Sequence, residues 1–231
     1  MNSSLRIYSF IMLLGLLVSS VAMAKEEPPK VTEDGLHLKE DSKFGLVYIN
    51  PDAVFTGYRR IILLEPYIAF KKDWKRDQNR SARGARRVSD KTMEDISTRL
   101  AAEFNIIFAE VLEENDGYEL VEETGEDVLI LRPAIINLDV TAPDLKTSGR
   151  STTYAQSAGE MTLYLEVFDS LTNSLIGKAY DRGQDRQSSF LTWHNSATNT
   201  SAARRILRGW SETLREGLDE ANSGLASPSS E

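Results

Sequence analysis

Hydrophobic and polar residues alternate with a period of two in several parts of this chain, which predicts β-strands. Residues 58–70 (YRRIILLEPYIAF) predict a mostly buried strand, with an edge position or a bulge at Pro66. Residues 128–140 predict a strand whose apolar face consists of Ala134, Ile136, Leu138 and Val140. Residues 161–167 predict another strand, which the turn sequence DSLTNS joins to a hairpin partner at 175–180.

Two other segments have the spacing of an amphipathic helix. One begins at Ser89 and ends at Asn-Asp-Gly (115–117), with apolar positions at Met93, Ile96, Leu100, Ile107 and Val111. The other closes the chain, with an apolar stripe at Ile206, Trp210, Leu214 and Leu218. Hairpin-length turns and one apolar stripe per helix predict an α+β fold, in which an antiparallel sheet carries two amphipathic helices on one face as a two-layer single domain.

The N-terminus has the three parts of a secretory signal peptide. Arg6 precedes a short apolar run, and the run ends in Ala-Met-Ala at 22–24. We therefore expect a signal peptide at 1–24 that is cleaved after Ala24, and an exported, periplasmic protein. An uncleaved anchor is the alternative interpretation. The predicted mature chain has a flexible leader at 25–34, the α+β domain at 35–222 and a disordered tail at 223–231.

The chain contains no cysteine, which excludes disulfides, a thiol nucleophile and a cysteine-based metal site. It also lacks the cysteine that carries the acyl chains of a bacterial lipoprotein. We expect the mature protein to be released rather than lipid-anchored.

The charge is segregated along the chain. Residues 71–87 (KKDWKRDQNRSARGARR) contain eight Lys or Arg and two Asp, a local charge of +6 in a chain of net charge −8. Removal of the signal peptide takes away only Arg6, so the mature chain outside this segment carries −15. The predicted binding residues of this basic segment, for an anion or a partner, are Lys71, Lys72, Trp74, Lys75, Arg76, Arg80, Arg83, Arg86 and Arg87.

Several ligands suit such a segment. Cations beside Trp74 would suit nucleic acid, but export and the acidic remainder of the chain argue against nucleic acid as a partner. An envelope anion fits better, namely peptidoglycan, lipopolysaccharide or anionic lipid, as does an envelope protein. The alternative is a solvated loop whose arginines pair with the acidic body.

Catalytic and metal-binding patterns are absent from the sequence. His37 and His194 are the only histidines, and no H-E-x-x-H, phosphate loop or G-x-S-x-G occurs. The carboxylates of 122–127 predict a solvated turn rather than an acid–base pair, and Asp181 and Asp185 lack the further ligands that Ca²⁺ needs. No catalytic residue, metal or cofactor is predicted, and enzymatic activity is not favoured.

The segment FLTWHN (190–195) precedes the last helix. Trp193 and His194 could form an aromatic binding lip, but a hydrophobic staple at the helix start is the favoured interpretation.

Four spaced segments resemble a bacterial family of exported proteins known as a domain of unknown function, DUF3313. They are YINPDAVFTGYRRIILLEPYIAFKKDW, DVLILRPAIINLDVTAPD, SAGEMTLYLEVFDSLTNSLIGKAYDR and WHNSATNTSAARRILRGWSETLREGLDEA. The resemblance covers about 36–221 and implies a Gram-negative envelope setting. Many members resemble lipoproteins, a pattern from which this chain departs because Lys25 follows Ala24. The resemblance implies no catalytic residues.

Three functional hypotheses remain open. The leading one is a periplasmic, non-enzymatic protein that binds an envelope component or an envelope protein through residues 71–87, with Trp74 as the anchor. The second is a periplasmic hydrolase that uses carboxylates assembled by the fold. The third is a structural subunit that associates with copies of itself.

Overall fold

The computed structural model describes residues 27–80, 87–140, 153–155, 159–184, 192–194 and 196–224. The predicted signal peptide, most of the predicted tail, and Arg83, Arg86 and Asp185 lie outside the described residues. The elements are β1 (His37–Leu38), β2 (Leu46–Ile49), β3 (Arg60–Leu63), β4 (Tyr67–Phe70), α1 (Trp74–Asn79), α2 (Asp90–Glu113), β5 (Glu119–Leu120), β6 (Val128–Val140), β7 (Thr153–Ala155), β8 (Gly159–Asp169), β9 (Leu175–Gln184), β10 (Thr192–His194) and α3 (Ser196–Asn222).

The main sheet has eight strands in the order β1-β2-β9-β8-β6-β3-β5, with β4 also paired to β6. The pairs β6–β8, β8–β9 and β9–β2 are antiparallel. Strands β3 and β4 pair with β6 in parallel, because α2 returns the chain to the end of the sheet where β3 began. The expected α+β class is confirmed, but the sheet is mixed rather than wholly antiparallel.

The strand predicted at 58–70 is two strands on one edge of β6. Ile61 pairs with Leu129 and Ile68 pairs with Ile135, while Pro66 lies between them and has no N–H to donate. The sequence predicted an edge position or a bulge at Pro66. In the structure the strand is interrupted there, between β3 and β4.

Strand β6 changes its inward face at Asn137, which adopts a left-handed backbone conformation with φ 54°. Before Asn137, Leu131 and Ile135 are fully buried against the helices, and after it Leu138 is buried. The register with β8 shifts between Ile136 and Asp139, as expected for a bulge. The predicted apolar face was therefore wrong at Ala134 and Ile136, which are half-buried on the other face.

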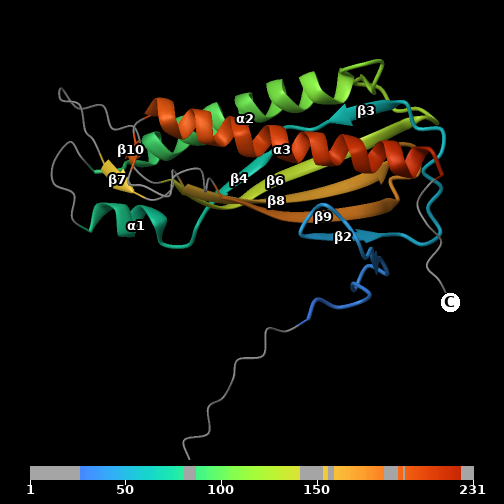
Figure 1. The fold of residues 1–231 in the computed structure, drawn as a ribbon, viewed down its shortest axis with the longest axis horizontal. Helices are drawn as coiled ribbons and strands as arrows, with labels where there is room; N and C mark the ends of the chain where they lie inside the picture. Colours follow the sequence, from blue (N-terminus) through green and yellow to red (C-terminus); the bar gives the residue numbers. More distant parts are fainter. Residues whose placement is uncertain are drawn as a thin grey trace, which may run out of the picture.

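Helices α2 and α3 lie side by side on one face of the sheet (Figure 1). Ser89 caps α2 by accepting a hydrogen bond from the Thr92 N–H, as its predicted N-terminal position requires. The core between the helices and the sheet includes Phe104, Phe108, Leu163, Leu165, Leu207 and Trp210. The two-layer arrangement is thus confirmed. A third helix, α1, forms within the basic segment, where no helix was predicted.

The residues before β1 are hydrogen-bonded from Lys30 onward. The Leu38 N–H donates to the Lys30 carbonyl at 2.8 Å, and the Thr32 N–H donates to the Leu36 carbonyl at 2.9 Å. The Lys178 ammonium also pairs with Asp34. The part of the expected flexible leader from Lys30 to Asp34 is therefore tied to the domain.

Candidate anion-binding site

Helix α1 is anchored to the domain by Trp74. The Trp74 side chain is 3% exposed and stacks on Phe70, with ring centroids 4.5 Å apart. Its Nε1–H donates to the Val140 carbonyl at 3.3 Å. Asp73, in a left-handed conformation with φ 64°, turns the chain from β4 into this helix. Trp74 therefore packs inward, and the prediction that it anchors a ligand is wrong, because its ring is buried.

Two lysines fix the base of α1 to the acidic body. Lys71 Nζ lies 2.9 Å from Asp139 Oδ2 and 3.5 Å from Glu160 Oε1. The hydrogen bond to Asp139 raises the pKa of Lys71. Lys75 Nζ lies 2.6 Å from Asp90 Oδ1 at the start of α2. Lys71 and Lys75 thus pair with the acidic body, whereas the alternative interpretation assigns such pairs to the arginines of the segment.

Asn79 ties the end of α1 to the start of α2. Its Nδ2 donates to the Val88 carbonyl at 2.9 Å, and its Oδ1 accepts from the Val88 N–H at 2.7 Å. Val88 is buried, so this double hydrogen bond fixes both ends of the segment between them.

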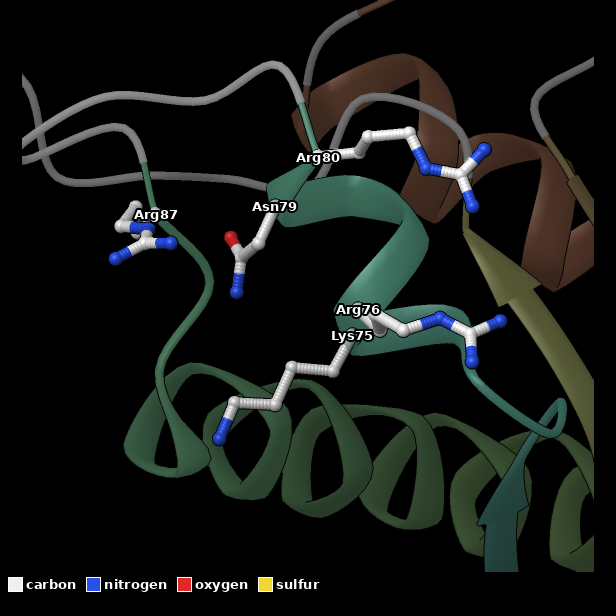
Figure 2. Close-up of a pocket in the computed structure, with 5 residues that line it drawn as sticks. All are labelled: Lys75, Arg76, Asn79, Arg80 and Arg87. Atoms are coloured by element: carbon white, nitrogen blue, oxygen red, sulfur yellow. The ribbon is translucent and has the colours of Figure 1, made fainter.

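An open hollow of about 490 Å³ lies beside α1. Its lining side chains all come from the basic segment, and they are Lys75, Arg76, Asn79, Arg80 and Arg87. Figure 2 shows the guanidinium groups of Arg76 and Arg80 on one side of α1, with Lys75 and Asn79 extending from the other side toward Arg87 and α2. Four cationic residues thus line the hollow, with their charged groups on two sides of α1.

The arginines of this hollow have only local acidic partners. Arg76 pairs with Asp73 at 3.1 Å and Asp77 at 3.4 Å, and Arg80 pairs with Asp77 at 3.4 Å. The Arg76 and Arg80 side chains are 64% and 76% exposed. Within the described part of the chain, the exposed Lys72 and Arg87 form no ion pair. We call Lys72, Lys75, Arg76, Arg80 and Arg87 the cationic cluster.

The carboxylates of 122–127 form no acid–base pair in the structure. Asp127 pairs with Arg60, and the hydrogen bond from that guanidinium holds the pKa of Asp127 below its usual value. Glu122, Glu123 and Glu126 are exposed. A solvated set of carboxylates matches the predicted turn, and at Asp127 the lowered pKa is the opposite of what a general acid needs.

Asp181 has a structural environment. Its carboxylate accepts from Trp210 Nε1 at 2.7 Å and from the Gly45 N–H at 2.9 Å, which joins α3, β9 and the segment before β2. Among the described residues, no group of three or more His, Cys, Asp or Glu is arranged to hold a metal ion.

Trp193 and His194 lie in β10, immediately before α3. Their backbone pairs antiparallel with β7, Trp193 opposite Tyr154 and His194 opposite Thr153. Their backbone is therefore a strand in a small second sheet. The choice between a binding lip and a staple depends on their side chains, which lie outside the described part of the structure, so both interpretations stay predictions.

Glu166, which the sequence did not single out, is a buried carboxylate on the sheet face away from the helices. It accepts from Arg132 Nε at 2.7 Å and from the Tyr164 hydroxyl, and Lys178 Nζ lies 3.9 Å away. Two cations and a hydroxyl neutralise and satisfy this carboxylate, which indicates a structural network. Only its alternating position in β8 marks it in the sequence.

No helix in the described parts of the chain is long and apolar enough to cross a membrane.

A search of curated proteins gives no match to this chain. Among solved structures it is similar to the PelC dodecamer from Paraburkholderia phytofirmans, at 9% identity and a TM-score of 0.36, over 73% of this chain and 96% of that one. Protein XCC0632 from Xanthomonas campestris, of family DUF330, matches at 10% identity and a TM-score of 0.42, over 77% and 94%. A putative neuraminyllactose-binding hemagglutinin homolog from Helicobacter pylori matches at 8% identity and a TM-score of 0.37, over 74% and 89%.

At these identities and TM-scores, the three structures say nothing about the activity of this chain. A family model gives a stronger relationship, because it matches residues 30–214 and so nearly the whole domain. The chain therefore belongs to the family described as protein of unknown function (DUF3313).

Proposed function

We propose that this protein is a non-enzymatic binding protein of the bacterial cell envelope, and that it holds an anionic envelope component on its cationic cluster. One observation carries the proposal. The hollow beside α1 is lined by four cationic side chains and Asn79, all from the basic segment. Guanidinium groups present paired N–H donors that match the oxygens of a phosphate or carboxylate.

The anchoring of α1 supports a preformed site. Trp74 is buried, Lys71 and Lys75 are paired to the body, and Asn79 is bonded to Val88. These contacts hold the helix in place while Arg76 and Arg80 stay exposed. A ligand would then bind without first ordering the backbone of α1, which lowers the entropic cost of association.

The existing partners of the arginines are weak competitors. Asp73 and Asp77 are exposed and belong to the same short segment, and exposed ion pairs contribute about 0–1 kcal/mol. A basic residue near an anionic membrane contributes ~1 kcal/mol. Several cations acting together therefore favour an anionic surface over the local aspartates.

The envelope setting rests on the predicted signal peptide and on the family resemblance. Export places the cationic cluster among lipid phosphates, lipopolysaccharide and peptidoglycan, and away from nucleic acid. The acidic remainder of the chain also opposes binding of a long polyanion across the whole molecule.

Co-sedimentation of the mature chain, residues 25–231, tests this function. The protein is centrifuged with purified sacculi, with vesicles containing phosphatidylglycerol and with zwitterionic vesicles, at low and moderate salt. We expect pelleting with an anionic target that weakens as salt increases. A variant with Lys72, Arg76, Arg80 and Arg87 changed to Gln should lose it. This set spares Lys71 and Lys75, which have structural ion pairs.

A matched control removes the same charge elsewhere. Lys30, Lys39, Lys43 and Arg59 lie outside the basic segment, and their replacement by Gln lowers the net charge equally. This control should still pellet. Equal loss in both variants, or no pelleting of the parent protein with any target, would reject the cationic cluster as a binding site.

A further inference from the structure

Two segments of opposite charge lie at the two ends of α2. The basic segment, 71–87, comes immediately before the helix. Residues 110–127 follow from its last turn, and they contain nine acidic residues and no Lys or Arg. A helix of 24 residues is ~36 Å long at 1.5 Å per residue. The two charged segments are therefore separated by the length of this helix.

The shape of the molecule agrees with this separation. In Figure 1, α1 lies at one end of the long axis, and α2 and α3 both run from that end to the other. The last turns of α3 bring Glu216, Asp219 and Glu220 to the far end as well. The molecule thus has a basic end at α1 and an acidic end where α2 and α3 finish.

Three arginines near the acidic end are paired with carboxylates there. Arg60 pairs with Asp127, and Arg215 pairs with Asp219 while donating to the Leu112 and Glu114 carbonyls. Arg208 pairs with Glu110. These contacts neutralise only part of the acidic end, which remains negative.

We propose that the protein binds the phosphate groups of an anionic membrane surface end-on, with its basic end at the membrane and the axis of α2 pointing away from it. This proposal rests on the proposed function and names its ligand as lipid phosphate. It also specifies how the molecule is oriented on the membrane, which does not follow from the cationic cluster alone.

Electrostatic screening explains the preference. The Debye length is ~10 Å at 0.1 M ionic strength. In an end-on arrangement the acidic end lies beyond that length from the membrane, so its repulsion is screened. An arrangement with α2 parallel to the membrane brings residues 110–127 within reach of the lipid charges. The cationic cluster is then attracted while the acidic end is repelled, which disfavours the flat arrangement.

The absence of cysteine from the chain makes single-site labelling direct. Three exposed positions report on distance from the membrane, Glu94 near the start of α2, Ala102 in its middle and Thr124 at the acidic end. Each is changed to Cys in the mature chain and labelled with a fluorophore. Vesicles contain phosphatidylglycerol with and without a lipid that carries a nitroxide quencher on its headgroup.

We expect the fluorescence loss to be largest at Glu94→Cys, smaller at Ala102→Cys and absent at Thr124→Cys. The Gln variant of Lys72, Arg76, Arg80 and Arg87 should abolish quenching at Glu94→Cys. Co-sedimentation of each labelled protein shows that the label has not blocked binding.

The other outcomes overturn the orientation in distinguishable ways. Equal quenching at Glu94→Cys and Thr124→Cys would mean flat binding, which leaves the proposed function intact. Pelleting with sacculi but not with vesicles would reject lipid phosphate as the ligand while supporting the cationic cluster. Failure to pellet with any target would reject both proposals.

Discussion

The side chain of Asn79 and the backbone of Val88 form two hydrogen bonds with each other, one in each direction. An asparagine amide has the same donor and acceptor groups as a peptide, so Asn79 acts here as a short piece of backbone. The pair closes the segment that carries Arg80 and Arg87, two members of the cationic cluster. The positions of Arg80 and Arg87 relative to each other therefore depend on this amide.

Replacement of Asn79 by Ala should open this closure. The N–H and carbonyl of Val88 lose their partners, which costs about 2 kcal/mol in the free energy of unfolding. Trypsin should cleave at Arg80 and Arg87 faster than in the parent protein, as measured by the rate of fragment formation. Gln78→Ala, at the neighbouring position, serves as the control. An unchanged cleavage rate in Asn79→Ala would show that the two hydrogen bonds do not hold the segment.

Trp74 should prove important for stability rather than for ligand contact. Trp74→Ala removes a buried ring that stacks on Phe70, and we expect a loss of about 3–5 kcal/mol in urea unfolding. Trp74→Phe retains the stack and loses only the hydrogen bond to Val140, so its loss should be smaller. If Trp74→Ala unfolded like the parent protein but no longer pelleted with vesicles, Trp74 would be a ligand contact after all.

Gly183 in β9 should not tolerate a side chain. A Cβ at this position would lie 2.2 Å from Ile206 Cγ2 and 2.8 Å from Trp210 Cζ2, so α3 would have to move away from the sheet. We expect Gly183→Ala to destabilise the fold by about 1–3 kcal/mol. Gly209→Ala is a suitable control, because a Cβ there would meet no atom within 4 Å beyond its own helix backbone. Equal urea midpoints for the two variants would contradict the close packing of α3 on β9.

Arg215 stabilises the end of α2 from the neighbouring helix. Its Nη1 donates to the Leu112 and Glu114 carbonyls, each at 2.9 Å, and its guanidinium lies 5.5 Å from the Tyr118 ring centroid. Arg215→Ala should lower the free energy of unfolding by about 2–3 kcal/mol, because those carbonyls lose a charged donor. Asp219→Asn removes the ion pair with Arg215, in which the carboxylate is exposed, and should cost about 1 kcal/mol or less. Similar losses of unfolding free energy in the two variants would mean that Arg215 stabilises the fold through its ion pair with Asp219, not through the hydrogen bonds to the carbonyls.

The ion pairs of Glu160 should make stability depend on pH. The hydrogen bond from Arg182, and then Lys71, lowers the pKa of Glu160 from 4.5 in the folded protein. A lowered folded-state pKa contributes stability above the unfolded value, and this contribution is lost as the pH falls through the folded value. The parent protein should therefore be more stable than Glu160→Gln at neutral pH, and the difference should shrink as the pH falls below 4.5 and through the lowered folded-state pKa. A difference that does not change with pH would contradict the assignment to ionised Glu160.

Local periodicity was sufficient to predict much of the fold. The inward positions of β8, Met161, Leu163, Leu165 and Val167, are all buried, and α2 is capped at Ser89 as predicted. These features depend on residues that are close together in the chain, so the hydrophobic periodicity predicts them directly. The parallel pairing of β3 with β6 was missed because it depends on where α2 returns the chain. The reversed face of β6 was missed because a single residue, Asn137, shifts the alternation.

The candidate site was predictable in composition but not in geometry. The run of cations in 71–87 was plain from the sequence. The sequence could not show which of these cations pair with the body and which stay exposed. The partners of Lys71 and Lys75 are Asp139, Glu160 and Asp90, which come from other elements. Trp74 was interpreted as an exposed anchor for the same reason. Its burial depends on Phe70 and on the end of β6.

The parallel edge of the sheet has a consequence for the order of folding. Arg60 in β3 pairs with Val128 in β6, so their contact closes a loop of 68 positions, whereas β8 and β9 are joined by a short turn. Loop-closure entropy makes distant pairings form slowly. We expect the hairpin of β8 and β9 to gain amide protection first during refolding, and β3 and β4 to join β6 last. Until then β3 and β4 stay unpaired, and the edge of β6 that they cover stays open to pairing with another strand.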